Sequence, residues 1–270
     1  MLVNEAIRNW RKEFPRFREY TYKVRTVTRE RTKEGRIKEE SSIAEGIFPN
    51  PKVFRTKKRL RHWVMIEKNG KPVPPGRIAK EWEKLGKRLE RAEREAEGAA
   101  PTEAWRGDYL LLAACVRGQC LKVFGEPILE GCDLSTPQRE TVGGREMIAI
   151  AFRPRPDAVF PEEYHTAHQA EGKLWIDAAD RIIARVALWP KGATFDDTSS
   201  DALLRGAAAA RDWMRTKEGA WLIRYTHVNA LAYQELFPRV EVEYMTESFD
   251  HRHFHVEVEE EQLDYPKPRH

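Results

Sequence analysis

Segments in which apolar and polar side chains alternate, joined by short turns containing glycine, recur along most of this 270-residue chain. The first begins at Tyr20, where Tyr20, Tyr22 and Val24 alternate with the polar residues Thr21, Lys23 and Arg25. Lys33-Glu34-Gly35 follows as a hairpin turn in which glycine is free to take a positive φ, and residues 36–48 return as a second strand. A two-residue period places alternate side chains on opposite faces of a strand, so this pattern predicts an antiparallel hairpin.

The same pattern extends through the rest of the chain. Further strands are predicted at 54–68, from Lys122 onward, at 147–152, at 172–177 with 181–189, at 213–216 with 221–228, and as a final pair at 240–245 and 249–258. Strands and helices do not alternate as in parallel folds, and a wide twisted sheet tends to curl or close. The sequence therefore predicts an α+β fold: one large antiparallel sheet of roughly ten strands that curls or closes, with two or three helices covering one face or plugging its mouth.

Helical periodicity marks the remaining elements. Residues 2–14 form a short amphipathic helix, and residues 103–116 are predicted to form another helix between strands. The clearest helix spans 76–97, and its apolar stripe consists of Ile78, Trp82, Leu85 and Leu89 among Glu, Lys and Arg. Residues 202–211 are ambiguous, because their Leu and Ala content favours a helix while the following residues indicate a hairpin.

No linker divides the chain. We therefore expect a single domain over residues 1–258, followed by a polar tail over 259–270.

Composition and charge exclude several classes of protein. A hydrophobic content of 41% is too high for a disordered chain. The longest uncharged apolar run, Tyr109–Val116, is far shorter than the roughly 20 residues of a membrane-spanning helix. Basic residues predominate in residues 1–100, but they alternate with Glu and Thr rather than forming a basic block. We therefore expect neither a transmembrane segment nor a nucleic-acid partner.

No motif of a nucleophilic or nucleotide-binding enzyme is present in the sequence. His251, His253 and His255 occupy alternate positions of a predicted strand and would share one face. Imidazole is a good zinc ligand, but neighbours on one strand face lie about 7 Å apart, too far for more than two to reach one ion at about 2.1 Å. A polar outer face is therefore favoured over a metal site, and we expect no cofactor.

Cysteine usage leaves the cellular compartment open. Cys115, Cys120 and Cys132 contain no CxxC pair, so a thiolate zinc site or redox dithiol is disfavoured. A Cys120–Cys132 disulfide with a buried Cys115 suits an oxidising compartment, and three buried thiols suit a reducing one. The first residues lack the basic and apolar regions of an export signal, which is compatible with a cytoplasmic protein or with an exported one after signal removal.

Several short segments, in a characteristic order and spacing, resemble a known group of proteins. They are the strand entry at 17–23 with its Lys33–Arg36 turn, the Glu67–Val73 turn, Gly143–Arg145 before Ile148–Phe152, the Gly172–Asp177 and Arg181–Val186 hairpin, Gly219–Ile223, and the closing Tyr244–Phe254 strand. Together they resemble the bacterial group related to the lipoprotein carriers LolA and LolB and to the sigma-factor regulator RseB. The likeness covers residues 15–258, and its individual motifs are not specific.

This resemblance implies a half-open barrel, a periplasmic or cell-envelope location with the signal peptide removed, and non-enzymatic binding of a lipid or lipoprotein acyl chain in an apolar interior. The ligand-pocket candidates are inward aromatic and aliphatic strand positions: Tyr22, Trp63, Met65, Ile148, Ile150, Phe152, Trp175, Trp189 and Trp221. Ile78, Trp82, Leu85 and Leu89 are candidates for a lid or docking helix. The alternative is an envelope interaction or sensor protein with a packed interior, no lipid and another envelope protein as partner.

Overall fold

The structure, a computed structural model of the chain, describes residues 2–13, 16, 19–47, 63–97, 112–116, 119–161, 164, 167–194, 199–237 and 241–253. Its helices are α1 (Leu2–Glu13), α3 (Pro75–Glu97), α4 (Glu126–Glu130), α5 (Ser200–Arg205) and the short 3-10 helix η4 (Ala167–Gln169). The main sheet contains β1 (Tyr20–Arg31), β2 (Ile37–Ile47), β3 (Trp63–Lys68), β4 (Lys71–Pro72), β7 (Cys132–Leu134), β8 (Gln138–Val142), β9 (Arg145–Pro154), β10 (Ala170–Asp177), β11 (Ile183–Pro190), β12 (Ala209–Arg215), β13 (Trp221–Asn229) and β14 (Val242–His253). A separate two-stranded sheet consists of β5 (Leu112–Val116) and β6 (Gln119–Phe124).

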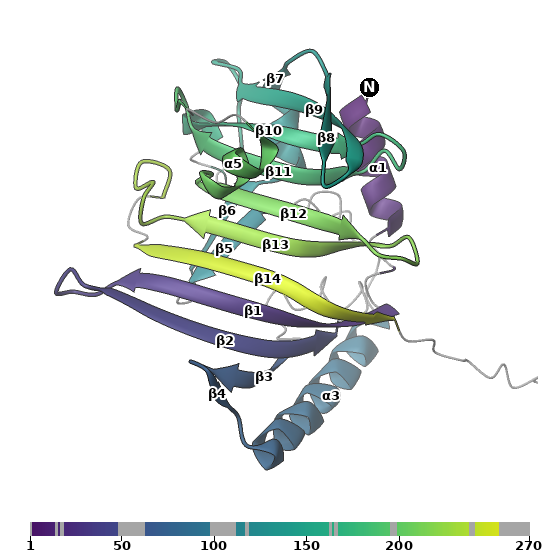
Figure 1. Cartoon of the computed structure of the whole chain (residues 1–270), viewed down its shortest axis with the longest axis vertical. Helices are drawn as coiled ribbons and strands as arrows, with labels where there is room; N and C mark the ends of the chain where they lie inside the picture. Colours follow the sequence, from purple (N-terminus) through teal and green to yellow (C-terminus); the bar gives the residue numbers. More distant parts are fainter. Residues whose placement is uncertain are drawn as a thin grey trace, which may run out of the picture.

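The main sheet has twelve strands in the order β4-β3-β2-β1-β14-β13-β12-β11-β10-β9-β7, with β8 also paired to β9 (Figure 1). Every described pair in it is antiparallel, and the sheet is not closed. The prediction of one large, half-open antiparallel sheet with helices is therefore confirmed. Strands β4, β7 and β8, of two, three and five residues, are too short to give a clear alternation, which explains the underestimate of ten strands.

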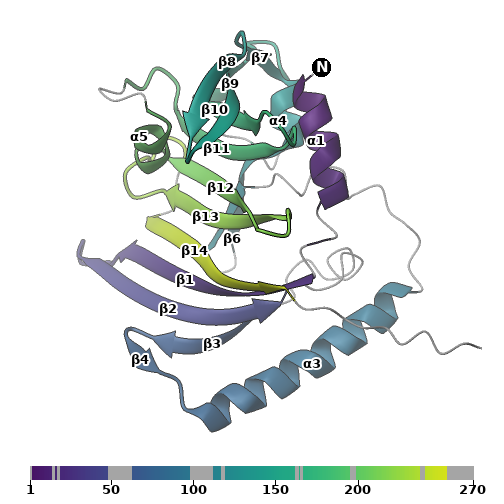
Figure 2. The same cartoon turned by 45° about the vertical axis from the view of Figure 1, so that its right-hand side comes forward.

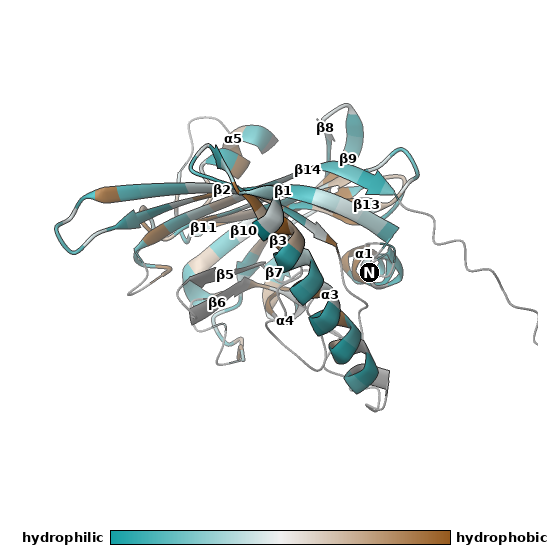
Figure 3. Ribbon diagram, turned by 90° about the horizontal axis from the view of Figure 1, so that it is seen from below, coloured by the Kyte–Doolittle hydropathy of each residue, from teal (hydrophilic) through white to brown (hydrophobic). Residues whose placement is uncertain are grey.

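Most of the other elements lie on one side of this sheet. Helices α1 and α4 and the β5–β6 sheet lie on the same side, which we call the inner face, whereas α5 lies on the opposite, outer face (Figure 3). Helix α3 runs beside the edge strands β3 and β4 (Figure 2). Directly paired residues of antiparallel strands point to the same face, so the strand register assigns each side chain to the inner or the outer face.

Helix α1 closes one end of the inner face. Its apolar stripe, which contains Val3, Ala6, Ile7 and Trp10, is buried, and the indole N–H of Trp10 donates a 2.7 Å hydrogen bond to the carbonyl of Ile183. This burial of one helix face is what the amphipathic period predicted. The predicted helices at 2–14 and 76–97 are thus both confirmed, as α1 and α3.

Two hairpin turns share the sequence Thr-Lys-Glu-Gly. One joins β1 to β2 at residues 32–35 and the other joins β12 to β13 at residues 216–219. Gly35 and Gly219 have φ values of 78° and 86°, a left-handed conformation that glycine adopts without steric cost. In each turn the glycine N–H donates to the threonine carbonyl, and the two turns lie at opposite ends of the sheet (Figure 1).

Two sequence predictions were wrong about secondary structure. Residues 112–116, predicted as the end of a helix over 103–116, form strand β5, while residues 103–111 lie outside the described part of the chain. A short apolar run without a period is compatible with either structure, and pairing with β6 decides for the strand.

The chain also ends differently from the prediction. Instead of a final pair of strands at 240–245 and 249–258, residues 242–253 form the single strand β14, which pairs with both β13 and β1. Asp250, with a φ of 51°, marks an irregularity in the pairing with β1 rather than a turn. The ambiguous segment 202–211 contains the end of helix α5 and the start of strand β12, so the sequence was right to indicate both a helix and a hairpin strand there. The predicted tail, 259–270, lies outside the described residues.

Candidate functional site

The inner face of β9–β12 is filled by side chains from α1, β6 and α4. The Trp10 ring lies 5.3 Å from the Trp213 ring, measured between centroids. Phe124 lies 5.4 Å from Phe152 in the same way. These four residues belong to one continuous cluster of buried apolar residues that also contains Ile128 of α4. Because these side chains belong to one buried cluster, this part of the inner face is core.

The predicted pocket residues divide among several places. Ile148, Ile150 and Phe152 lie in the main cluster and face α4 and β6, whereas Trp175, Trp189 and Trp221 are buried elsewhere around the same cluster. Tyr22 is buried but belongs to neither described apolar cluster. Trp63 and Met65 are half-buried on the edge strand β3. The structure therefore does not bring all nine candidates together.

Two of the candidate tryptophans have polar partners. The Trp175 indole N–H donates to Glu140 at 2.8 Å, and the Trp221 indole N–H donates to Asp180 at 2.9 Å. Trp175 also pairs in register with Arg185, which places it on the outer face. Sequence alternation could not show which face Trp175 occupies, because both faces of β10 are buried.

A different part of the inner face carries half-buried polar side chains. Arg211 of β12 shares the face of Trp213 and donates a 3.1 Å hydrogen bond to the Thr226 hydroxyl. Its guanidinium lies 5.9 Å from the centroid of the Trp213 ring. Burial lowers the pKa of Arg211 to about 10.

The Tyr244 phenol lies near Arg211 on the inner face, and the Tyr22 phenol lies near Tyr244. Burial raises the pKa of Tyr22 and that of Tyr244, and the charge of Arg211 partly opposes the effect on Tyr244. Sequence reasoning missed Arg211 and Tyr244. The one available signal was the position of Arg211 within the alternation that begins at Ala209, where a charged residue occurs in an otherwise apolar row.

Helix α3 is held to the sheet by a second, separate apolar cluster. Leu85 and Leu89 are buried against Val64 of β3, and Ile47, Ile78 and Trp82 pack around them. The structure thus brings the four predicted lid residues together on one side of α3. Its remaining described surface is mostly hydrophilic, as the colouring of Figure 3 shows.

The three alternating histidines, His251, His253 and His255, do not form one site, because the two described ones contact different residues. Burial lowers the pKa of His251, which hydrogen-bonds to the backbone of Ile223, and the His253 ring lies 5.0 Å from the Tyr20 ring. His255 lies outside the described residues. In the described part of the chain, no group of three or more His, Cys, Asp or Glu residues is arranged to hold a metal ion.

Cys132 is a free, buried thiol in strand β7. The Cys120–Cys132 disulfide left open by the sequence is therefore not formed in this structure. Burial raises the pKa of the Cys132 thiol to about 11, against the opposing effect of nearby Arg155. A thiol with so high a pKa is a poor nucleophile at neutral pH.

Comparison with known proteins gives likenesses of structure only. No family model matches the sequence, and no curated protein was found to be similar to it. Solved structures to which the chain is similar include a DUF1329 family protein from Desulfovibrio piger, with 9% identity over 93% of this chain and 92% of that chain and a TM-score of 0.34. A domain of the outer membrane lipoprotein-sorting type from Vibrio parahaemolyticus has 8% identity over 96% and 95%, with a TM-score of 0.35. A LolA superfamily protein from Nitrosomonas europaea has 7% identity over 94% and 93%, with a TM-score of 0.31.

These neighbours include a member of the LolA superfamily, the group that the sequence resemblance names. At such TM-scores the likeness carries no argument about a ligand or a site. Among the described helices, none combines the length and the apolar character needed to span a membrane.

Proposed function

We propose that this chain is a non-enzymatic binding protein of the bacterial cell envelope that holds a lipid or lipoprotein acyl chain against the inner face of β1 and β14, beside α3. The supporting observation is that the two described apolar clusters are separate. Val24 and Tyr244 lie between them on the inner face, are half-buried, and belong to neither cluster. We therefore propose a ligand site away from β9–β12, because the core there is filled.

Helix α3 is the element suited to act as a lid over this site. Ala92 is buried in the described part of α3, and two larger apolar side chains of the helix, Leu85 and Leu89, are buried against Val64 of the sheet. Each such side chain contributes about 1.5–3 kcal/mol on burial. An acyl chain contributes about 0.8 kcal/mol per buried CH2, so a twelve-carbon segment could supply up to about 10 kcal/mol before ordering costs. Ligand burial can therefore offset the release of α3.

A second function is favoured by the filled half of the sheet. The continuous core around Trp10, Phe124 and Phe152 supports an envelope interaction or sensor protein that works through protein contacts without a lipid. The two functions differ in one measurable respect, since only the first requires a bound apolar ligand.

The test is native mass spectrometry of the freshly purified protein before and after organic extraction. The binding function predicts an extra mass, matching a fatty acid or phospholipid, that extraction removes. Val24→Trp, on the inner face of β1, should abolish the extra mass by filling the site. Val27→Trp lies on the outer face of the same strand, is equally half-buried in the parent, and should retain it. Circular dichroism confirms that both variants fold.

An unchanged mass in the parent protein would reject lipid binding and leave the interaction function. Loss of the ligand in both variants would reject the inner face as the site. The proposed periplasmic or envelope location, with a signal peptide removed, is tested by fractionating cells that express the protein from its natural gene. Recovery in the cytosolic fraction would contradict it.

A further inference from the structure

The outer face carries a groove that the proposed function does not use. It has a volume of about 380 Å³ and crosses β9 to β13, between the β8–β9 turn and the β12–β13 turn. Buried Trp175 and Asp212 lie at its floor, and Met147 and Met214 contribute apolar surface. Figure 1 looks onto this face of the sheet.

Four cations line the groove at accessible positions: Arg145, Arg215, Lys217 and Arg224. Two of these cations, Arg145 and Arg224, pair with carboxylates that are turned into the protein. The Arg224 side chain is 49% exposed and Asp212 only 6%, and Arg145 is 38% exposed against 1% for Asp177. Because the base is more exposed than the acid in these pairs, the groove presents positive charge to solvent.

Single carboxylates serve more than one guanidinium here. Asp180 accepts from Arg215 at 2.7 Å and lies 3.6 Å from Arg145, while also accepting from the Trp221 indole. Asp212 accepts from Arg224 at 2.6 Å and from Arg185 at 3.0 Å. Shared carboxylates leave part of the guanidinium hydrogen-bonding capacity to other acceptors, since each guanidinium has five N–H donors.

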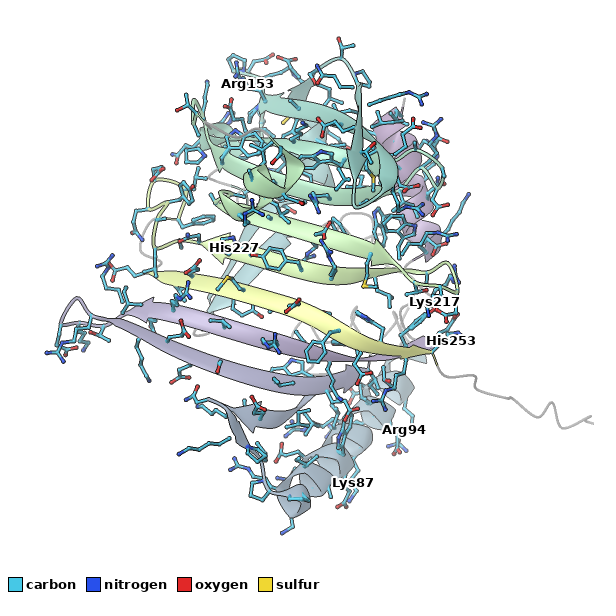
Figure 4. All side chains as sticks on the ribbon, in the orientation of Figure 1. Lys87, Arg94, Arg153, Lys217, His227 and His253 are labelled. Atoms are coloured by element: carbon cyan, nitrogen blue, oxygen red, sulfur yellow. The ribbon has the colours of Figure 1, made fainter. Side chains whose placement is uncertain are left out.

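Lys217 adds a cation at the β12–β13 turn, where Figure 4 labels it. Among the described residues, no carboxylate forms an ion pair with its ammonium group. Asp201 of α5, which is 67% exposed, faces the buried Arg185 and places one negative charge beside the groove. Asp201 interacts with Arg224 as well as with Arg185, so the groove cations that it leaves to a ligand are Arg145, Arg215 and Lys217.

Apolar surface lies between these charges. The guanidinium of Arg145 lies 5.6 Å from the centroid of the Trp221 ring, so a cation and an indole face share one wall. A ligand that fits must combine negative groups with apolar ones.

We propose that this groove binds an acidic segment of a protein partner in an extended conformation. Strands β9 and β13 are four strand spacings apart, or about 19 Å at about 4.8 Å per spacing. An extended peptide of about six residues spans that distance at about 3.3 Å per residue. A small anion would occupy only a small part of a groove that crosses these strands. This site is independent of lipid binding on the inner face.

The two Thr-Lys-Glu-Gly turns supply a matched pair of variants. Lys217 lies in the turn beside the groove, and Lys33 occupies the same position of the identical turn at the far end of the sheet. Lys217→Glu and Lys33→Glu change the net charge equally and in the same local backbone. Any difference between them therefore reports position rather than overall charge.

The experiment uses the whole chain and a fluorescently labelled six-residue peptide in which Glu and Leu alternate. A peptide with Gln in place of Glu has the same shape without the charge. Fluorescence anisotropy at low salt should show the Glu peptide binding at least about tenfold more tightly than the Gln peptide. Lys217→Glu should weaken binding about tenfold, Lys33→Glu less than about twofold, and Lys217→Arg should retain it.

Three results would overturn the proposal. Equal binding of the Glu and Gln peptides would show that the negative charge of the peptide does not contribute to binding. Equal loss in Lys217→Glu and Lys33→Glu would show non-specific attraction. Tighter binding of anionic phospholipid vesicles, with the same Lys217 dependence, would assign the groove to a membrane surface instead. If Lys217→Glu still retains the co-purified lipid, the loss of peptide binding is due to the groove and not to a change at the inner-face lipid site.

Discussion

Strands β11 and β2 belong to the same sheet but occupy opposite environments. Seven of the eight residues of β11 are buried, so both of its faces are covered. In β2 only Ala44 and Gly46 are buried, and the end near the β1–β2 turn is exposed. The half of the sheet around β11 is a core layer, whereas the half around β2 is a surface that other molecules can reach.

Ion pairs show the same contrast. Arg185 and Asp212, on the outer face of β11 and β12, are 5% and 6% exposed and hydrogen-bond at 3.0 Å. Arg25 and Glu247, on the outer face of β1 and β14, are 53% and 56% exposed at 3.4 Å. The same chemistry therefore has different consequences, because removing one partner of a buried pair leaves an uncompensated charge and removing one partner of an exposed pair does not.

The largest expected effect is in the buried half. Trp10→Ala removes the side chain that joins α1 to the sheet and leaves the Ile183 carbonyl without its indole donor. We expect the free energy of unfolding to fall by about 3–5 kcal/mol, measured by urea denaturation. Trp82→Ala, in the half-buried part of the α3 cluster, is the control and should have a smaller effect. Equal losses would show that the two halves do not differ.

Asp212→Ala tests the buried charge pair directly. It leaves Arg185 and Arg224 without their shared acceptor, and we expect a loss of about 3–5 kcal/mol in the same assay. Glu247→Ala, in the exposed pair with Arg25, should change stability by less than about 1 kcal/mol. A small effect of Asp212→Ala would mean that Asp201 alone holds Arg185, which Asp201→Ala in that background would then reveal.

Helix α3 offers a smaller and more local effect. Leu85→Ala removes a buried side chain from the cluster with Val64, and we expect a loss of about 2 kcal/mol. Hydrogen exchange should increase in residues 75–97 while β10 and β11 keep their protection. Lys87→Ala, at an exposed position paired with Glu83, should leave exchange unchanged. Parallel loss of protection in β10 and β11 would show that α3 is not an independently opening element.

The sequence was sufficient wherever the signal was local. The Gly35 and Gly219 turns, the amphipathic α1 and the long α3 each follow from residues within one segment, and all were predicted. Strand β5 and the continuous β14 were not, because each is decided by its pairing with another strand. Pairing between distant strands is a tertiary property that overrides local preference.

The candidate sites depend on the same tertiary information. Alternation placed Trp175 in a strand, but only the register with Arg185 shows that it faces outward. The groove draws its cations from β9, β12, β13 and the turn at Lys217, segments that lie far apart in the sequence. Neither the face nor the grouping can be read from one segment, so the inner site was predicted only as a set of candidates and the outer groove was not predicted.

The smallest expected effect lies where the two halves meet, at His227 of β13, which Figure 4 labels on the outer face. Its ring is 3% exposed, and Nε2 lies 3.0 Å from Glu243. Nδ1 has no hydrogen-bond partner among the described residues. Burial lowers the pKa of His227, and nearby Arg29 adds to this effect, while Glu243 opposes it.

A lowered pKa in the folded state makes stability depend on pH in a defined direction. Above about pH 6.5 the histidine is neutral in both states and has no effect. Below that pH the unfolded chain binds a proton that the folded protein resists, so the free energy of unfolding falls until the pH passes the folded pKa. His227→Gln should therefore flatten the decline between pH 6.5 and 5, measured by urea denaturation at a series of pH values.

His251 supplies the comparison for this prediction, because burial lowers its pKa as well. His251→Gln should remove its own share of the decline, and the double variant should be flatter than either single one. Additive effects would place the two histidines in independent environments, as expected from their separate partners, Glu243 and the Ile223 backbone. An unchanged slope in His227→Gln would instead mean that the junction between the two halves admits water to the imidazole, and the contrast between them would then begin at β12 rather than at β13.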